Sequence, residues 1–213
     1  MSIAHHPGEE LLLAYAAGAA EEAVSLLVAS HLAMCRDCRA AVAGTEAAGG
    51  SLLAQVPPVA LDRGAYQSLL SRLDAPAAKI VRSAKLASDV PAPLQAYVGS
   101  DFDAIAWRHI TTGLACYPLP MKGKARARLI RATAGAGVAT HTHRGEEWTL
   151  VLTGSYSDST GRYGAGDVQS TTPEIRHRPV ADPGPVCINL AVTDAPLIFE
   201  GLVPKVIGKL FGF

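Results

Sequence analysis

The sequence predicts a two-domain protein in which a small all-α bundle precedes an all-β barrel. Residues 9–73 contain leucine-rich and alanine-rich segments with helical spacing, separated by Gly and Pro. Beyond residue 97 the chain consists of short β-like segments between clusters of Gly, Pro and Asp, a pattern that favours a sandwich or barrel. Each part also contains a cluster of metal-binding residue types. We expect the helical domain to span residues 1–85, a linker 86–97 and the β domain 98–213.

Four helices are expected in the N-terminal part, at about residues 9–18, 20–31, 35–49 and 61–73. The first begins after Pro7-Gly8, and the acidic residues in its first turn suit the helix dipole. The third ends at Gly49-Gly50, and Pro57-Pro58 breaks the chain before the fourth. Because a bundle of this size has a marginal hydrophobic core, it needs an additional source of stability.

In the C-terminal part, β-strands are expected at residues 126–131, 148–156 and 186–192. The stretch before this part, residues 74–96, is punctuated by prolines and is typical of a linker. The apolar tail, residues 197–213, is interrupted by Gly and Pro. We therefore expect the tail to dock onto the β domain rather than to form a membrane-surface helix.

Composition excludes several classes of partner. The formal net charge is zero, so no general electrostatic attraction to nucleic acid or to anionic lipid is expected, and we predict neither as a direct partner. The N-terminus lacks the pattern of a secretory signal, and no apolar segment reaches the roughly 18 residues needed to span a bilayer. The four cysteines, Cys35, Cys38, Cys116 and Cys187, are scattered rather than arranged as a disulfide framework. This pattern indicates a reducing cytoplasm.

The most informative stretch is His31-Leu-Ala-Met-Cys35-Arg-Asp-Cys38. The spacing i, i+4, i+7 would place one imidazole and two thiols along one stripe of an α-helix. Together with a histidine from the upstream pair His5-His6, they can complete a tetrahedral zinc site of two His and two Cys. Spacing alone does not decide between His5 and His6.

Two other interpretations of the Cys-x-x-Cys pair are a redox dithiol and simple packing. The redox interpretation is weakened because the surroundings are helical, with no preceding strand. A disulfide would also leave His31 without a role. The zinc interpretation accounts for the small core as well, because the free energy of metal binding becomes free energy of folding.

The helical part has more leucines than so small a bundle can bury. Leu11-Leu12-Leu13 are consecutive, as are Leu26-Leu27-Val28, so they cannot all face one core. Surplus apolar surface indicates a partner protein, and the alternative is that some of these side chains face the linker or the second domain.

Residues 1–85 resemble the zinc-binding anti-sigma domain, on the strength of His6, the His31-x3-Cys35-x2-Cys38 motif, and the Pro57-Pro58 break before a final leucine-rich helix. The resemblance implies that His6 is the fourth zinc ligand. It also implies that the domain binds an extracytoplasmic-function sigma factor of bacterial RNA polymerase and blocks its polymerase-binding surfaces. A domain of this family is not itself a DNA binder.

A second cluster lies in the β part, where His141 and His143 share one face of a predicted strand. Glu147 has the same parity, although the Arg144-Gly145 turn can reset the register, and its neighbour Glu146 is the rival. Two imidazoles and a carboxylate suit a first-row divalent metal such as zinc, iron or manganese. The alternative is a metal-free barrel lined by polar residues.

The spacing from Gly135 through His141, His143 and Glu147 to Gly154 resembles the first motif of the cupin family. The resemblance covers about residues 100–195 and implies a jelly-roll barrel with its ligands facing inward. The second cupin motif is looser. It places His177 as the fourth ligand, with the approach Gly166-Asp167 and Pro173, but Ile175 replaces the usual Gly and Ala181 the usual Asn.

An anti-sigma domain followed by a cupin-like barrel resembles the ChrR-type anti-sigma factors over nearly the whole chain. The resemblance implies an anti-sigma factor whose barrel releases the sigma factor under oxidative stress, including singlet oxygen. The second hypothesis for the function is a metal-dependent, dioxygenase-like cupin enzyme. Such an enzyme would need a large pocket and additional acid–base groups. A zinc-stabilised module with a partner other than sigma is a third alternative. We identify no catalytic residues and expect no enzyme activity.

Overall fold

The structure is a computed structural model that describes residues 3–73 and 88–201. Its helices are α1 (Glu9–Ala16), α2 (Glu22–Met34), α3 (Arg36–Leu53), α4 (Ala65–Leu73), α5 (Ala92–Val98) and the short 3-10 helix η1 (Phe102–Ala104). Its strands are β1 (Arg108–Thr111), β2 (Leu114–Pro118), β3 (Arg126–Ala132), β4 (His141–His143), β5 (Glu147–Thr153), β6 (Ser155–Asp158), β7 (Gly161–Gly164), β8 (Val168–Thr171), β9 (Val180–Ala181), β10 (Cys187–Thr193) and β11 (Leu197–Phe199).

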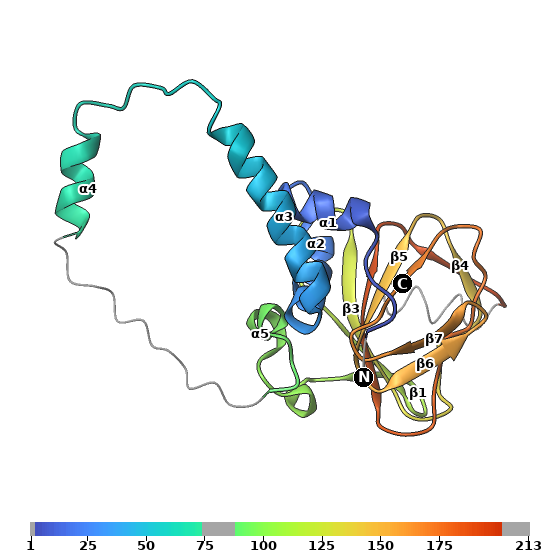
Figure 1. Ribbon diagram of the computed structural model, residues 1–213. Helices are drawn as coiled ribbons and strands as arrows, with labels where there is room; N and C mark the ends of the chain where they lie inside the picture. The colour runs from blue at the N-terminus through green and yellow to red at the C-terminus, as the bar shows by residue number, and fades with distance from the viewer. Residues whose placement is uncertain (1–2, 74–87, 202–213) are drawn as a thin grey trace.

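The predicted fold class is confirmed, because helices make up the N-terminal part and antiparallel strands the C-terminal part (Figure 1). Two expectations for the helices differ, and the expected strand 148–156 is divided at Gly154 into β5 and β6, which belong to different sheets. Helix α3 continues through Gly49-Gly50 to Leu53, because Ala47-Ala48 before the glycines and Leu52-Leu53 after them are strong helix formers. The proline-punctuated stretch contains helix α5, which begins directly after Pro91, where a proline is compatible with a helix start.

The barrel is built on a six-stranded antiparallel sheet with the order β1-β2-β3-β10-β5-β8. A three-stranded sheet, β7-β6-β9, and the pair β11-β4 complete it. Strand β10 lies between β3 and β5, where Leu190 pairs with Leu129 on one side and Leu150 on the other. Every residue of β10 is buried, because both faces of this part of the sheet are covered.

Helix α2 covers the outer face of the sheet, so the helical part and the barrel share one hydrophobic core (Figure 1). Leu27 and Val28 of α2 belong to the same cluster as Leu129, Leu150 and Leu190 of the barrel. The consecutive apolar residues of α2 are therefore buried together, since α1, α3, α5 and the sheet surround this helix. This result supports the alternative that part of the leucine surplus faces the second domain.

Two carboxylates at the start of α2 fasten the helix to the loop before β3. Glu21 accepts hydrogen bonds from the backbone N–H groups of Lys124 and Ala125, both at 2.9 Å. Glu22 accepts one from the N–H of Lys122 at 2.7 Å. These backbone hydrogen bonds lower the pKa of both carboxyl groups, so the contact is made by the charged forms.

The first part of the predicted tail docks as expected, because β11 pairs with β4 from Leu197↔His143 to Phe199↔His141. Residues 74–85 of the expected helical domain, residues 86–87 of the expected linker and residues 202–213 of the tail lie outside the described part of the chain. Within the described ranges, no helix combines the length and apolar character required to cross a membrane.

Candidate metal centres

The first cluster lies where α2 meets α3, and its geometry corrects the expectation of a single helical stripe. His31 is in the last turn of α2, and Cys38 is in the first turn of α3. Between them Cys35 has extended backbone angles, φ −107° and ψ 115°, so the helix ends and a new one starts. The Cys35 thiol caps the new helix by accepting a hydrogen bond from the N–H of Cys38 at 3.5 Å. This break, rather than helical periodicity, brings the three side chains together.

The structure brings His6, and not His5, to the thiols. Nδ1 of His6 lies 3.3 Å from Sγ of Cys38 and 3.5 Å from Sγ of Cys35. One ligand atom from each of His6, His31, Cys35 and Cys38 lies within 4.8 Å of all the others. Tetrahedral zinc with ordinary bond lengths separates its ligand atoms by roughly 3.3–3.8 Å, so the four residues fit the ion with small adjustments.

His31 supplies a direct test of that fit. Its Nδ1 donates a hydrogen bond to the carbonyl oxygen of Gly166 at 2.9 Å, which fixes the tautomer and leaves Nε2 as a lone-pair donor. That Nε2 is buried without a hydrogen-bond partner, which is costly unless a cation binds there. Burial lowers the pKa of His31, which favours the neutral ring that a metal requires.

The thiols of Cys35 and Cys38 also favour a bound zinc ion at this cluster. Burial, reinforced by the neighbouring Cys35 sulfur, raises the pKa of Cys38 to about 12, so without a cation this thiol stays protonated. All four cysteines are free thiols in the structure. Two soft sulfur donors with two imidazoles are the donor set of structural zinc sites.

The second cluster lies inside the barrel, where β4 supplies His141 and His143, β5 begins with Glu147, and the loop before β9 supplies His177. All four residues are buried. Oε2 of Glu147 lies 3.0 Å from Nε2 of His143 and 3.6 Å from Nε2 of both His141 and His177. The rival carboxylate, Glu146, is exposed and lies outside the cluster.

Each imidazole of the second cluster is oriented by a hydrogen bond on its outer side. Nδ1 of His141 donates to the carbonyl of Ala139 at 2.8 Å, and Nδ1 of His143 donates to that of Thr172 at 3.3 Å. The remaining ring, His177, has its Nδ1 2.7 Å from Oδ2 of Asp158. Three Nε2 atoms therefore converge on one carboxylate. Outer acceptors of this kind are typical of histidines that bind a metal.

Electrostatics favour a cation at this position. Burial opposes the charge of Glu147, but hydrogen bonds from the three histidines outweigh it and hold its pKa well below the usual range. Burial also opposes the charge of His177, yet Asp158 and Glu147 raise its pKa to about 9. In the metal-free protein a proton on His177 thus supplies positive charge that a divalent ion would supply when bound.

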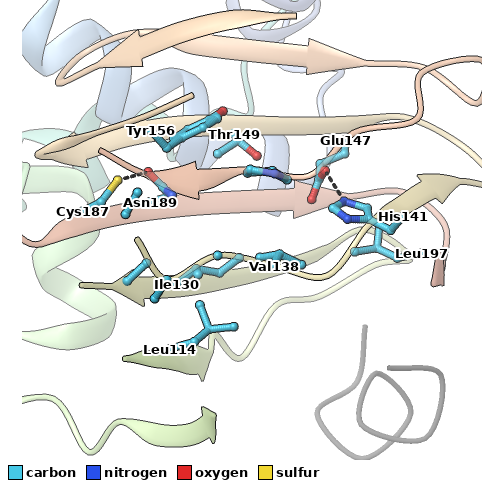
Figure 2. Close-up of a pocket in the computed structure, with 15 residues that line it drawn as sticks. Leu114, Ile130, Val138, His141, Glu147, Thr149, Tyr156, Cys187, Asn189 and Leu197 are labelled. Atoms are coloured by element: carbon cyan, nitrogen blue, oxygen red, sulfur yellow. Dashed lines mark hydrogen bonds and ion pairs between the residues drawn. The ribbon is translucent and has the colours of Figure 1, made fainter. Parts of the chain in front are cut away.

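A cavity of about 30 Å³ extends from this cluster along the barrel (Figure 2). His141 and Glu147 lie at one end, and Cys187 and Asn189 at the other, with Ile130 among the apolar residues between them. A space of this size holds a few water molecules rather than an organic substrate. Burial raises the pKa of Cys187 to about 12, so the thiol at the far end is protonated.

Sequence reasoning missed the residue that orients His177. The side chain of Asp158 is fully buried and also accepts a 2.7 Å hydrogen bond from Nε2 of Gln169. Asp158 ends strand β6, 19 residues before His177, and no local pattern links the two. The pairing of β6 with β9 brings the segments that contain them side by side.

In this protein a helical bundle that contains a His2Cys2 cluster packs on a cupin barrel that contains a His3Glu cluster. The fold is therefore that of a two-domain cupin protein with two candidate metal centres. Residues 95–195 match the family described as the ChrR cupin-like domain. The chain is also 43% identical to the anti-sigma-E factor ChrR of Cereibacter sphaeroides over 211 residues, 99% of either chain. It therefore belongs to the ChrR family of anti-sigma factors.

Solved structures agree with this assignment. The crystal structure of Rhodobacter sphaeroides SigE in complex with the anti-sigma ChrR matches with a TM-score of 0.81 and 44% identity, covering 91% of this chain and 100% of that one. An RmlC-like cupin protein from Ralstonia eutropha JMP134 matches at 22% identity, over 46% of this chain and 68% of that one, with a TM-score of 0.39. The second likeness is too distant to support an argument.

Proposed function

We propose that this protein binds and inhibits an extracytoplasmic-function sigma factor in the cytoplasm, and that its barrel releases the sigma factor under oxidative stress. The observation that carries the first part is the 43% identity over 99% of the chain to a named anti-sigma factor. The related solved structure is a complex of such a factor with SigE. Both comparisons span the helical part and the barrel together.

An exposed apolar surface supports a protein partner. Eleven large hydrophobic side chains of the described residues are exposed, and nine of them lie between Leu52 and Leu73. We call residues 52–73 the apolar arm, which comprises the end of α3, the following loop and α4 (Figure 1). Exposing this much apolar surface is unfavourable for a free protein, so the arm is suited to being covered by a partner.

Helix α4 has the pattern of a helix that binds in a groove. Tyr66, Leu69, Leu70 and Leu73 have the spacing i, i+3, i+4, i+7, which places them on one stripe. All four are exposed, Leu70 least at 40% and Leu73 most at 72%, and no residue of α4 is buried. The helix stands apart from the bundle in Figure 1, so this stripe is available to a sigma factor.

The two clusters take different roles in this proposal. Zinc bound by His6, His31, Cys35 and Cys38 would hold the break between α2 and α3, and so keep the helical part in its sigma-binding shape. Zinc or another first-row divalent metal bound by His141, His143, Glu147 and His177 would serve the release step. Release requires a signal that favours the sigma-free state by a coupling free energy.

The size of the barrel cavity argues against the enzyme alternative. The space that reaches His141 and Glu147 is about 30 Å³, which leaves no room for an organic substrate beside the candidate metal. A regulator needs no such room, because its signal acts through conformation rather than through turnover.

The test is in vitro transcription by RNA polymerase with the cognate sigma factor, in the presence of the purified full chain. We expect inhibition at stoichiometric amounts and a stable complex by size-exclusion chromatography. Leu69→Asp should weaken sigma binding by tenfold or more, because it places a charge in the centre of the stripe.

The matched control is Ser68→Asp, which adds the same charge one residue away on α4, off the stripe. It should bind sigma nearly as well as the unmodified chain. Equal binding by all three proteins would exclude the arm as the contact surface, and a lack of inhibition by the unmodified chain would contradict the anti-sigma function itself.

A further inference from the structure

A single short segment of the barrel, Gly166–Thr171, contacts both candidate metal centres. It consists of the turn Gly166-Asp167 and the four residues of β8, which is the edge strand of the six-stranded sheet. With a rise of about 3.3 Å per residue, β8 covers about 10 Å between its first and last residue. The two ends of the Gly166–Thr171 segment contact different clusters.

At one end the segment positions two of the four residues of the helical cluster. The carbonyl of Gly166 orients His31, as described above. Oδ1 of Asp167 accepts hydrogen bonds from the backbone N–H groups of Ala4 and His5, at 2.7 and 2.9 Å. The N–H of Val168 donates to the carbonyl of His5 at 3.0 Å. The residues just before His6 are therefore hydrogen-bonded to Asp167 and to the edge of β8.

The contact is close enough that a side chain at Gly166 would displace Ile3. A Cβ atom there would lie 2.5 Å from Cδ1 of Ile3, and the backbone has a φ of +93° that favours glycine. Ile3 thus packs directly on the backbone of the turn. The N-terminal segment and the turn are therefore closely packed, and close packing transmits a displacement of one group to the groups in contact with it.

At the other end the same strand contacts the barrel cluster. Oγ1 of Thr171 lies 3.4 Å from Nε2 of His143 and donates to the carbonyl of Glu147 at 3.4 Å. Gln169 donates from Nε2 to Oδ2 of Asp158, and that same oxygen orients Nδ1 of His177, both at 2.7 Å. Two of the three histidines are therefore in contact with β8, directly or through one carboxylate.

A second route joins the same two ends through aromatic rings. The ring of His5 lies 4.6 Å from that of Tyr163, which stacks on Tyr156 at 5.3 Å. The hydroxyl of Tyr156 donates to Oε1 of Gln169 at 2.7 Å. Tyr156 and Gln169 are buried, so this contact is shielded from solvent.

We propose that Gly166 and Asp167 are positioning residues for the helical zinc cluster, and that the Gly166–Thr171 segment couples zinc affinity there to metal occupancy of the barrel. This rests on the proposed function in one respect, namely that both clusters bind metal. Metal in the barrel fixes His143 and His177, which holds β8 and the turn in the arrangement that orients His31 and His6. Loss of that metal frees the strand and weakens the helical site. Linkage requires the reverse effect to be equally large.

The experiment uses Co²⁺ as the probe, because only the helical cluster contains thiols. Thiolate-to-cobalt charge-transfer absorption therefore reports occupancy of the helical site alone, even when Co²⁺ also binds the barrel. The affinity of this site is measured on the full chain by competition with a chelator. Four proteins form a cycle, namely the unmodified chain, His141→Ala, Asp167→Ala and the double variant.

We expect His141→Ala to lower the cobalt affinity of the thiolate site by about 5- to 150-fold, the usual range of coupling between sites. In the Asp167→Ala background, His141→Ala should change the cobalt affinity of the thiolate site by less than twofold, because the contact between the N-terminal segment and the turn is already lost. Asp167→Asn, which keeps an acceptor oxygen, should restore part of the affinity that Asp167→Ala loses.

Asp182→Ala is the matched control. Asp182 is also a barrel carboxylate with several hydrogen bonds, to Ser155, Ser157 and Arg162, but none of them reaches the N-terminal segment. His141→Ala should still lower the cobalt affinity of the thiolate site in the Asp182→Ala background. The proposal is overturned if His141→Ala leaves the thiolate site unchanged, or if its effect is equally large in the Asp167→Ala and unmodified backgrounds.

Sigma binding measured on the same samples separates this inference from the proposed function. A chain that binds sigma and cobalt normally but shows no coupling contradicts the inference alone. A chain that binds sigma but develops no charge-transfer absorption contradicts the inference and the proposed role of zinc, and leaves the anti-sigma function standing.

Discussion

Nδ1 of His31 donates a 2.9 Å hydrogen bond to the carbonyl oxygen of Gly166, which lies 135 residues away in a turn of the barrel. A candidate ligand of the helical cluster is thus oriented by the second domain, in the same way that hydrogen-bond acceptors orient metal-binding histidines in general. The helical part and the barrel are therefore connected at the candidate zinc site as well as through their shared hydrophobic core.

Replacing Cys38 by Ser should abolish sigma inhibition. The change removes one zinc ligand at the start of α3, and structural zinc sites contribute on the order of 10 kcal/mol of binding free energy that becomes folding free energy. We expect weaker zinc retention, a lower melting temperature of the helical part and no sigma binding. Metal analysis, circular dichroism and a pull-down measure these three quantities.

Cys116→Ser provides the comparison, because Cys116 is also a buried free thiol but lies in β2, outside both clusters. It should retain zinc and sigma binding. Full sigma inhibition by purified, zinc-free Cys38→Ser protein would refute a structural role for the metal.

The sequence predicts the candidate sites as far as local spacing can. Strand parity places His141 and His143 on one face, the resemblance to the cupin family implies that this face is the inner one, and both residues are buried in the structure. For the helical cluster, the spacing of His31, Cys35 and Cys38 indicates candidate ligands that the structure brings together, but it implies the wrong local geometry. In the structure the chain breaks at Cys35, and both thiols lie within 3.5 Å of Nδ1 of His6.

The contacts between distant segments are not predictable from one sequence. Gly166 acts through its backbone carbonyl, so the identity of its side chain contains no signal of the contact with His31. Similarly, the run Leu26-Leu27-Val28 does not follow a single helical stripe, because α2 is buried on several sides at once. The amphipathic pattern that marks a surface helix is absent for this physical reason.

Glu147→Gln should leave sigma inhibition intact and remove the response to oxidative stress. Structural zinc sites bind with on the order of 10 kcal/mol, so a helical site weakened by about 5- to 150-fold through the coupling still retains its zinc. The change weakens the barrel cluster by removing the carboxylate charge on which three imidazoles converge. The apolar arm lies elsewhere and should bind sigma as before. A reporter of the sigma-dependent genes, measured before and after exposure to singlet oxygen, gives both quantities.

Glu146→Gln is the neighbouring control, because Glu146 is exposed and its side chain lies outside the cluster. It should respond to stress normally. If the Glu147→Gln strain still induces the reporter to the usual extent, the barrel cluster is not the sensor.

Stability of the metal-free barrel should fall with rising pH because of His177. Asp158 and Glu147 raise its pKa from 6.5 to about 9, against the effect of burial. The folded state therefore binds the proton more tightly than the unfolded state, and this contribution is complete below pH 6.5 and lost as pH rises through about 9. The loss should be on the order of 2–3 kcal/mol, measured by denaturant unfolding in the presence of a chelator.

His177→Gln should show a much smaller change over the same pH window. Unfolding free energies of the unmodified chelated protein that are equal at pH 6.5 and pH 9.5 would contradict the assigned protonation of His177.

A fragment of residues 1–85 should inhibit sigma when supplied with zinc, because it contains all four thiol and imidazole ligands and the apolar arm. It should also be less stable than the full chain, since the face of α2 that packs on the barrel becomes exposed. Thermal unfolding and a sigma-binding titration test both expectations. A folded, zinc-loaded fragment that fails to bind sigma would mean that the barrel contributes directly to the interaction.

Gly123→Ala should loosen the contact between α2 and the barrel. Gly123 has a φ of +94°, and a Cβ there would lie 2.6 Å from Oε2 of Glu21. The carboxylate avoids the clash by moving away from the added atom, which weakens its hydrogen bonds to the backbone of Lys124 and Ala125. Gly135→Ala isolates the backbone strain, because Gly135 has a similar φ of +79° with nothing within 4 Å of the added atom.

We therefore expect Gly123→Ala to lower the melting temperature by several degrees more than Gly135→Ala. In a Glu21→Ala background the difference between the two glycine variants should disappear, since the clash and the hydrogen bonds are both absent. A difference that persists without Glu21 would show that the loop, and not its contact with α2, determines the loss of stability.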